Sequence, residues 1–360
     1  MFNITLGLVY FFGKQKPPLD LTTPSLAINQ LAAKALYFTP SARAYLIAHR
    51  PELVPAENQK ADSEQSRLFA QATQDPAVWR RLARQLQFDT LLLTGDPGEY
   101  RPLLRHLLSS QDWVLAYVDY TSLIFKRSGE KSWIPEDLKP VLGSFSEASA
   151  SQRAAVLAQI SSKLLAVTQY AEAKRCLDQA LDLDKKLPEV WTAKALYQLH
   201  FGQWPQALES ANQALAIDEN YLPALSAKAH LLFTLHKFQD AQEVSKRLVA
   251  DSPKNPQVLL LHAKIAHEAE DYTTEAETLL TIIELGEKEG ISTTGYQLFL
   301  AQAYAHNGQA VQALEQFRRV LQAPDITQEQ QSNVQECIAS IQSKIEPQSG
   351  QPALSVPVKN

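Results

Sequence analysis

Large aromatic residues recur along the second half of the chain at a constant spacing. Tyr170, Trp204, Phe238 and Tyr272 stand 34 residues apart, and an alanine follows three residues after each of the first three: Ala173, Ala207 and Ala241. A fixed period of 34 residues is the length of one helix–turn–helix unit, which buries its apolar face only by stacking on its neighbours. The pattern therefore predicts an array of stacked helix pairs.

Small residues fill a second set of repeated positions. When the units are counted from Ala154, Pro188, Leu222 and Pro256, the eighth position of each unit is small: Ser161, Ala195, Ala229 and Ala263. Small side chains let neighbouring helices approach closely. A fifth unit opens at Thr294, 38 residues after Pro256 instead of 34, so we expect an extra loop at residues 286–293.

The turns between the paired helices are marked less regularly. Gly202 and Gly308 fall where a left-handed backbone is often required, whereas His236 and Glu270 hold the same place in two other units. After the fifth unit, residues 326–346 place Val334, Ile338, Ile341 and Ile345 on one helical face. This stretch predicts a helix that caps the last exposed core, and the Pro-, Ser- and Gln-rich residues 347–360 predict a disordered tail.

The period, the alanines and the turn residues resemble the tetratricopeptide repeat family over residues 153–325. The resemblance implies about five helix–turn–helix repeats wound into an all-α right-handed superhelix. It also implies a concave groove, lined by the first helix of each repeat, whose ligands are often extended peptides. On this chain the residues carried over to a partner-binding groove are Thr192, Leu196, Leu199, Ser226, His230, Phe233, Leu260, Lys264, His267, Leu298 and Gln302.

One subset of the family clamps a terminal carboxylate between paired Lys and Asn residues. This chain departs from that pattern, because Ala158 and Ser162 hold the clamp places of the first unit. An acidic chaperone tail is therefore not the expected ligand. His230 and Lys264 remain candidates for hydrogen bonds to a peptide, and the alternative is that they belong to an ordinary solvated helix face.

Residues 1–130 show a mixed pattern that predicts a small α/β domain, joined to the array by a linker at residues 131–152. We expect helices at 26–37, 42–49, 76–86 and 99–110, and strands at 88–93, 113–118 and 122–125, the last two forming a hairpin. Residues 4–12 predict a buried strand. Their alternative is the end of a membrane helix that lies upstream in a longer relative, since residues 2–12 are apolar but too short to span a bilayer.

Apolar and aromatic residues between positions 65 and 128 suggest a second resemblance. Trp79, the run 88–93, the run 112–119 and residues 124–127 are similar to the soluble tail after the last membrane helix of bacterial polytopic glycosyltransferase-like proteins. The catalytic acids of that family lie in loops between membrane helices, so the resemblance implies no activity for this stretch.

Charge and candidate chemistry narrow the possible functions. The net charge is −5, and residues 1–150 carry 16 Lys and Arg against 15 Asp and Glu. Because no part of the chain is strongly basic, binding to nucleic acid is not predicted. Cys176 and Cys337 are interpreted as buried small hydrophobes. His262 and His267 point to different sides of a helix, so they cannot share an ion. We expect no metal, cofactor, catalytic residue or small-molecule substrate.

The sequence therefore predicts a non-catalytic scaffold that binds a protein or peptide. One alternative is an accessory or truncated soluble part of a membrane glycosyltransferase-like protein of the cell envelope, associated with the membrane through an upstream or N-terminal segment. Another is a soluble enzyme with its site near Gly95 and Asp119. Because Lys14 and Lys16 follow the apolar residues 2–12, no signal peptide is predicted and the sequence as written indicates the cytoplasm; a membrane-associated or periplasmic location is the alternative.

Overall fold

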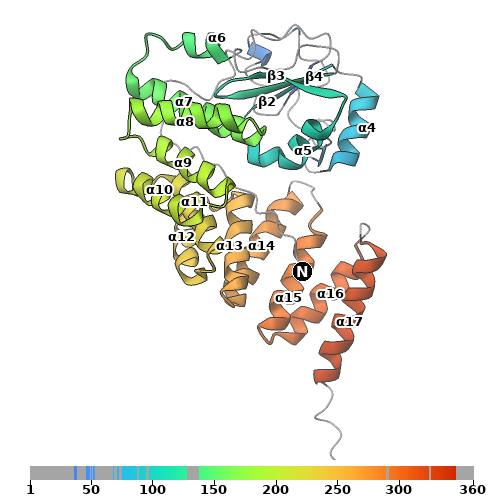
Figure 1. Ribbon diagram of the computed structural model, residues 1–360. Coiled ribbons are helices and arrows are strands. Elements are labelled where there is room, and N and C mark those ends of the chain that lie inside the picture. Colours follow the sequence, from blue (N-terminus) through green and yellow to red (C-terminus); the bar gives the residue numbers. More distant parts are fainter. Residues whose placement is uncertain are drawn as a thin grey trace, which may run out of the picture. The chain divides into compact units, whose positions relative to one another are not determined.

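A computed structural model describes residues 75–86, 89–94, 97–127, 138–288, 292–323 and 326–345, with short pieces at 36–38, 46–48, 50, 52, 68 and 71–72. Two compact units divide between Leu235 and His236. The first contains a small sheet with its helices and the beginning of the repeat array, and the second contains the remaining helices (Figure 1). The predicted fold class, a small α/β domain followed by an all-α repeat array, is confirmed.

The sheet of the first unit has four strands in the described residues. β1 (Leu36–Phe38) is parallel to β2 (Thr90–Thr94), and β4 (Ser122–Arg127) is antiparallel to both β2 and β3 (Trp113–Val118). The strand order is therefore β1-β2-β4-β3. All the side chains of β2 are buried, as expected of a central strand covered on both faces. The predicted strands 88–93, 113–118 and 122–125 are confirmed, including the hairpin.

The prediction for the start of the chain was wrong at one point. Leu36 and Tyr37, expected at the end of a helix, lie in β1, where Leu36 pairs with Thr90 and Tyr37 with Leu91. An aromatic, apolar triplet fits a strand as well as a helix, and pairing with a distant strand decides between them. Residues 46–48 of the predicted helix 42–49 are helical, and the predicted strand at residues 4–12 lies outside the described residues.

Two helices cover one face of the sheet (Figure 1). They are α4 (Pro76–Leu86) and α5 (Arg101–Ser109), which follows the short 3-10 helix η3 (Pro97–Tyr100). Leucines of α5 are buried at 103, 104 and 107, and Trp79 of α4 packs against Trp113 of β3 with ring centroids 5.8 Å apart. The helix predicted from residue 99 begins at Arg101, because η3 occupies the preceding turn.

The core of the sheet continues into the first repeats. One hydrophobic cluster joins residues of β2 to β4 with residues of α7 (Ala150–Ala166), α8 (Tyr170–Leu183) and α9 (Pro188–His200). The residues expected to form a linker contain α6 (Leu138–Gly143) and the capping box of α7, in which Ser149 and Gln152 each bond the other's backbone N–H. The predicted domain boundary at residues 131–152 stays a prediction.

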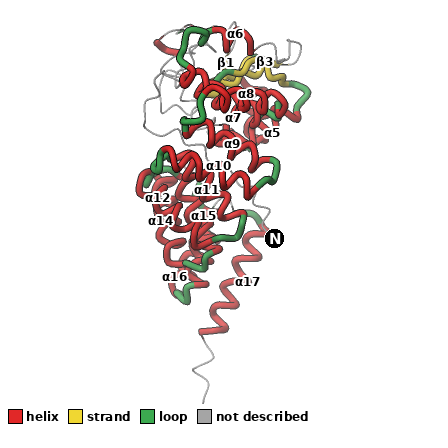
Figure 2. Tube along the Cα trace, turned by 60° about the vertical axis from the view of Figure 1, so that its left-hand side comes forward, coloured by secondary structure: helices red, strands yellow, loops and turns green. Residues whose placement is uncertain are grey.

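Helices alternate through the rest of the chain as the 34-residue period predicts (Figure 2). In the first unit α10 (Trp204–Ile217) and α11 (Leu222–Thr234) follow α9. The second unit contains α12 (Phe238–Asp251), α13 (Pro256–Glu268), α14 (Tyr272–Lys288), α15 (Thr294–His306), α16 (Ala310–Leu321) and α17 (Gln328–Ile345). The repeated aromatics Tyr170, Trp204, Phe238 and Tyr272 are each the first residue of a second helix.

Two of these aromatics contact a histidine of the next first helix. The ring of Tyr170 lies 4.9 Å from that of His200, and Tyr272 stacks on His306 at 5.0 Å. Both histidines occupy the last position of a first helix, α9 or α15. The repeated small residues Ala173, Ala207 and Ala241 are completely buried. At Tyr170 and Tyr272 the repeated aromatic residue therefore contributes to the contact between successive repeats.

The turns between first and second helices share a left-handed residue. The φ angle is 71° at Gly202 and 74° at Gly308, and it is also positive at Thr168 (63°), His236 (57°) and Glu270 (59°). The predicted conformation of the two glycines is confirmed, and three other residue types adopt it in the other repeats. At the end of the array Val334 of α17 is buried in a cluster with Phe317 and Val320 of α16, as expected of a capping helix.

Candidate interaction surface on the repeat helices

The predicted groove residues occupy three equivalent positions on the first helices of the repeats. Counted from the first residue of α9, α11, α13 and α15, they are the fifth, ninth and twelfth residues. The first unit contributes Thr192, Leu196, Leu199, Ser226, His230 and Phe233, and the second contributes Leu260, Lys264, His267, Leu298 and Gln302. The structure places these two groups in different surroundings.

In the first unit the side chains at the fifth and ninth positions of α9 and α11 are buried. Thr192, Leu196, Ser226 and His230 are each at most 4% exposed. Leu196 belongs to the hydrophobic cluster that continues into the sheet, and the Thr192 hydroxyl donates to the Pro188 carbonyl within α9. Contrary to the sequence expectation, these four side chains are packed inside the protein and do not line an open surface. Only the twelfth positions, Leu199 and Phe233, are partly exposed.

In the second unit the same positions are more open. Leu260 and Lys264 of α13 and Leu298 and Gln302 of α15 are all partly exposed. Leu260 packs at the edge of a cluster formed by α13, α14 and α15, so part of its side chain is buried and part remains accessible. The second unit therefore presents a mixed apolar and polar surface, in which leucines alternate with Lys264 and Gln302.

Lys264 stands out on this surface by its charge. Its ammonium group is half buried, and burial alone lowers the pKa of the side chain. No carboxylate in the described part of the chain pairs with it. A cation that is partly removed from water without an opposite charge is costly for the fold, and an anion from outside would relieve that cost.

His267, in contrast, is engaged within its own repeat. Its ring Nδ1 donates to Oε2 of Glu275 on α14 at 3.0 Å, and Glu275 is only 5% exposed. The hydrogen bond to Glu275 raises the pKa of His267, burial opposes this rise, and the negative charge of Glu275 adds to it. The pair joins α13 to α14. Sequence reasoning missed Glu275, because the two residues are eight apart on different helices and have no motif in common.

A serine–histidine pair also lies in the second unit. The Oγ of Ser245 on α12 and the Nδ1 of His262 on α13 are 2.8 Å apart and share a hydrogen bond. Ser245 is completely buried, and burial lowers the pKa of His262. A nucleophile must be reachable by its substrate, so this pair acts as a packing contact between the two helices. In the preceding repeat, Ser210 of α10 and Gln198 of α9 also share a side-chain hydrogen bond between two helices.

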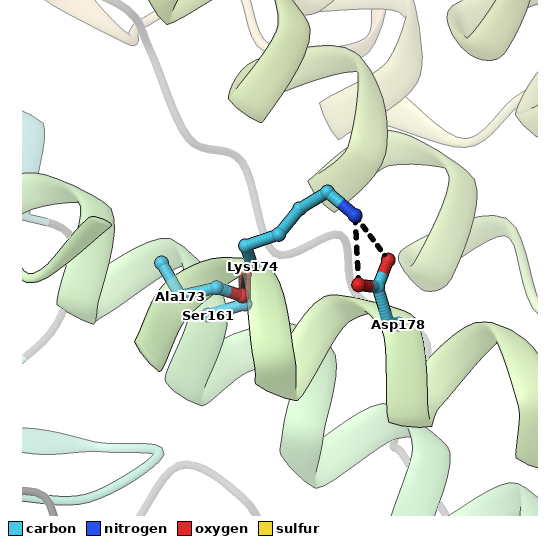
Figure 3. A network of polar contacts seen from close by, with 4 residues as sticks. All are labelled: Ser161, Ala173, Lys174 and Asp178. Atoms are coloured by element: carbon cyan, nitrogen blue, oxygen red, sulfur yellow. Dashed lines mark hydrogen bonds and ion pairs between the residues drawn. The ribbon is translucent and has the colours of Figure 1, made fainter. Parts of the chain in front are cut away.

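In the first repeat a serine makes a third hydrogen bond between two helices (Figure 3). Ser161, at the small eighth position of its repeat, donates from its hydroxyl to the Ala173 carbonyl of α8 at 2.7 Å. Beside it, the Lys174 ammonium bonds to both oxygens of Asp178 one turn later on the exposed side of α8. Ser162 occupies one of the two positions where the carboxylate-clamp residues of the family subset would stand. Its hydroxyl donates to the Ala158 carbonyl of its own helix.

The proposed enzyme site at the sheet is occupied by structural contacts. Asp119 is completely buried between β3 and β4, and its Oδ1 accepts from the backbone N–H groups of Thr121 and Ser122, both at 2.7 Å. The Tyr117 hydroxyl donates to Oδ2. Burial raises the pKa of Asp119, and the bonds from Thr121 and Ser122 oppose that rise. The carboxyl group therefore holds the hairpin turn, and Gly95 lies outside the described residues.

Metal ligands, thiols and membrane-spanning helices are the remaining candidate features. In the described part of the chain, no three His, Cys, Asp or Glu side chains are placed to hold a metal ion. Cys176 is free and buried, and burial raises the pKa of its thiol to about 11. Within the ranges that the structure describes, no helix combines the length and the hydropathy needed to cross a bilayer.

Comparison with known proteins identifies the repeat. Two family models, both described as tetratricopeptide repeat, match residues 161–221 and 198–265. The curated small glutamine-rich tetratricopeptide repeat-containing protein 2 of Mycosarcoma maydis is 28% identical over 93 residues, or 26% of this chain. The chain spans about a quarter of the length of that relative (26%). The two family models match no part of residues 65–128. The resemblance of that stretch to a glycosyltransferase-like tail is therefore not supported.

Several solved structures are similar at low identity. YrrB, described as a TPR protein with an unusual peptide-binding site, is 13% identical with a TM-score of 0.45, covering 56% of this chain and all (100%) of YrrB. MamA 41-end from Desulfovibrio magneticus RS-1 is 20% identical with a TM-score of 0.41, covering 47% of this chain and 94% of that one. The first TPR of Spaghetti (RPAP3), bound to an HSP90 peptide, is 26% identical with a TM-score of 0.31, covering 32% and 95%.

The repeated residues, the helices that they form and the two family matches agree with one another. Over residues 161–265 the chain is therefore similar to the tetratricopeptide repeat family.

Proposed function

We propose that this chain is a non-catalytic interaction protein that holds an extended peptide or protein segment on the first helices of its second unit. Tetratricopeptide repeats are generally protein-interaction scaffolds and bind proteins or peptides. Within this array the predicted groove positions are accessible on α13 and α15, where Leu260, Lys264, Leu298 and Gln302 are partly exposed. The proposed contact surface is made of these four residues.

The observation that carries the proposal is the half-buried, unpaired Lys264. A carboxylate of the partner would bond to its ammonium group and offset the cost of removing that charge from water. Leu260 precedes Lys264 by one helical turn and offers apolar area to a neighbouring side chain of the partner. We therefore expect a ligand that places one Asp, Glu or terminal carboxylate next to an apolar residue.

A selection with random peptides tests this proposal. The full chain is immobilised as bait for a phage-displayed peptide library, and selected peptides are synthesised and measured by fluorescence anisotropy. Lys264→Met should weaken their binding about tenfold, from the roughly 1.5 kcal/mol of one charge-assisted hydrogen bond. The melting temperature should stay equal or rise, because the substitution removes a half-buried charge. Lys254→Met, at an exposed site of the same unit, is the matched control.

A double-mutant cycle makes the test specific. If the carboxylate of the peptide contacts Lys264, amidating it should cost affinity with the wild-type chain and almost none with Lys264→Met. The proposal fails if no peptide is enriched over bait-free selection, or if Lys264→Met and Leu260→Ala bind the selected peptides as the wild type does. Alanine at His230, which the sequence favoured as a groove residue, should instead affect stability, since that side chain is buried.

A further inference from the structure

Two histidines from the first helices of successive repeats lie close together on the second unit. His267 is near the end of α13, and His306 is the last residue of α15. Their ring centroids are 6.2 Å apart, and both residues are exposed. Sequence reasoning compared His267 only with His262 of its own helix, whereas its neighbour in space belongs to the next repeat. Histidine is the commonest metal ligand in proteins, so an exposed pair of imidazoles is a candidate metal site.

Glu275 fixes the orientation of the His267 ring. Nδ1 of His267 donates to the buried carboxylate of Glu275, at 3.0 Å from Oε2 and 3.2 Å from Oε1. Because the proton of the neutral ring then stays on Nδ1, the lone pair that can bind a metal is on Nε2. A metal-binding histidine almost always donates from its other nitrogen to a carboxylate, a carbonyl or water. His267 is therefore held in the form that a metal ion requires.

Tyr272 lies against both histidines. Its ring stacks on that of His306, with centroids 5.0 Å apart and planes 20° apart, and its centroid is 6.0 Å from that of His267. The three helices α13, α14 and α15 also share one buried apolar cluster, which includes Leu259 and Leu300. Ligands on packed helices are positioned more precisely than ligands on loops. The fold thus sets the places of both rings before any ion binds.

The separation of the two rings is close to that of two imidazoles on one ion. Zinc binds histidine nitrogen at about 2.0–2.1 Å, so two ring centres around a tetrahedral ion are about 5 Å apart. The observed 6.2 Å exceeds this separation by about 1 Å. Because His306 is exposed, rotation of its side chain can close the difference.

The charges around His267 are mainly negative. The carboxylates of Glu275 and of Glu268, the next residue on α13, both act on its ring and raise its pKa. Lys264, half buried, stands about one turn earlier on the same helix. A divalent cation at Nε2 of His267 would therefore meet two carboxylates nearby against one ammonium group.

We propose that His267 and His306 bind one divalent transition metal ion such as zinc, with Glu275 as the positioning residue behind His267. Imidazole nitrogen suits zinc, copper and nickel, whereas magnesium and calcium prefer oxygen ligands. In the described part of the chain no three His, Cys, Asp or Glu side chains could hold an ion together, so water completes the coordination of the bound ion. This proposal departs from the sequence expectation of no metal, and it does not depend on the proposed peptide surface.

Isothermal titration calorimetry of the full chain with ZnCl2 tests the proposal. The titration is done at about pH 8, where a histidine with the ordinary pKa of about 6.5 is neutral. Zinc should bind, and MgCl2 should give no signal. His306→Gln should abolish zinc binding, because it removes one of the two protein ligands. His236→Gln is the matched control, since His236 is also an exposed histidine of the second unit, and it should bind zinc as the wild type does.

Nitrogen NMR of the histidine rings identifies the ligand atoms and the role of Glu275. Zinc should perturb Nε2 of His267 in the wild type, and Glu275→Gln should weaken zinc binding about tenfold while both tautomers of His267 appear. Circular dichroism should show that each variant remains folded. The proposal is overturned if the wild type binds no zinc, if His306→Gln keeps its affinity, or if His236→Gln loses binding equally. Zinc on Nδ1 of His267 would also overturn it, since Glu275 would then have no positioning role.

Discussion

The left-handed turns of the repeats offer a direct test of how the backbone limits stability. Gly202 has a φ of 71°, and a Cβ added there would meet no atom within 4 Å. The equivalent residue of the preceding repeat is Thr168, which is exposed and has a φ of 63°. Steric overlap therefore makes no contribution to Gly202→Ala, and the change in free energy of unfolding comes from the backbone alone.

The expected magnitude follows from two opposing terms. A residue with a Cβ costs about 1–2 kcal/mol in the left-handed region. Removing glycine from the unfolded chain returns about 0.4–1 kcal/mol of conformational entropy. Gly202→Ala should therefore lower the free energy of unfolding by about 1 kcal/mol, and Thr168→Gly should raise it by a similar amount, since a β-branched residue is especially strained there.

Urea unfolding followed by tryptophan fluorescence measures both changes. All five tryptophans, at 79, 113, 133, 191 and 204, precede residue 236, so the signal reports the first compact unit. Gly143→Ala is the control, because that glycine is equally unobstructed, belongs to the same unit and has no positive φ. The reasoning is refuted if Gly202→Ala and Gly143→Ala have the same effect, or if Thr168→Gly destabilises the unit.

Two further predictions concern side-chain contacts between paired helices. Ser161→Ala should cost about 1 kcal/mol in the same urea experiment, because it removes the buried hydrogen bond to the Ala173 carbonyl, whereas Ser162→Ala, whose hydroxyl bonds within its own helix, should cost much less. Equal losses would show that the cross-helix bond contributes nothing of its own. The His267–Glu275 pair should make the second unit pH-dependent. Because the folded pKa of His267 is raised, its stabilisation is complete below the ordinary histidine pKa of about 6.5 and is lost as pH rises through the folded pKa. An NMR titration should show the His267 pKa falling in Glu275→Gln while that of His262 stays below its usual value; an unchanged His267 pKa would contradict the assignment.

The helices of the array could be predicted because their signals are local and repeated. A helix that begins at Tyr170 can be recognised again at Trp204 and at Tyr272, so each repeat confirms the others. The left-handed turns at Thr168 and Glu270 were harder to predict, since the residue types do not favour that conformation. Their place in the 34-residue period was the only available signal.

The sheet domain was less predictable because its decisive contacts are distant in sequence. Leu36 is in a strand because it pairs with Thr90, and no pattern near residue 36 records that partner. The hairpin of β3 and β4 was predictable, since its turn residues and both strands lie within one short stretch. Thus local pairings can be inferred from one sequence, whereas the addition of β1 to the sheet cannot.

The burial of the groove positions was the least predictable feature. Helical spacing shows that Leu196 and Lys264 occupy the same register position, but it does not show what packs over each of them. In the structure Leu196 lies in a cluster shared with the sheet, and Lys264 is partly open. The same position is therefore buried in one repeat and partly exposed in another.

The two ends of the array are covered by different means, and this difference accounts for the burial of the predicted groove positions on α9. Stacked repeats leave apolar surface at each end, which a capping element must cover. At the carboxyl end α17 provides the cover, with Val334 buried against α16. At the amino end the first repeat shares its hydrophobic cluster with the sheet, so α7 to α9 are part of a larger core. The sheet domain thus stabilises the first repeats and buries the fifth and ninth positions on α9, while the equivalent positions on α13 stay partly exposed.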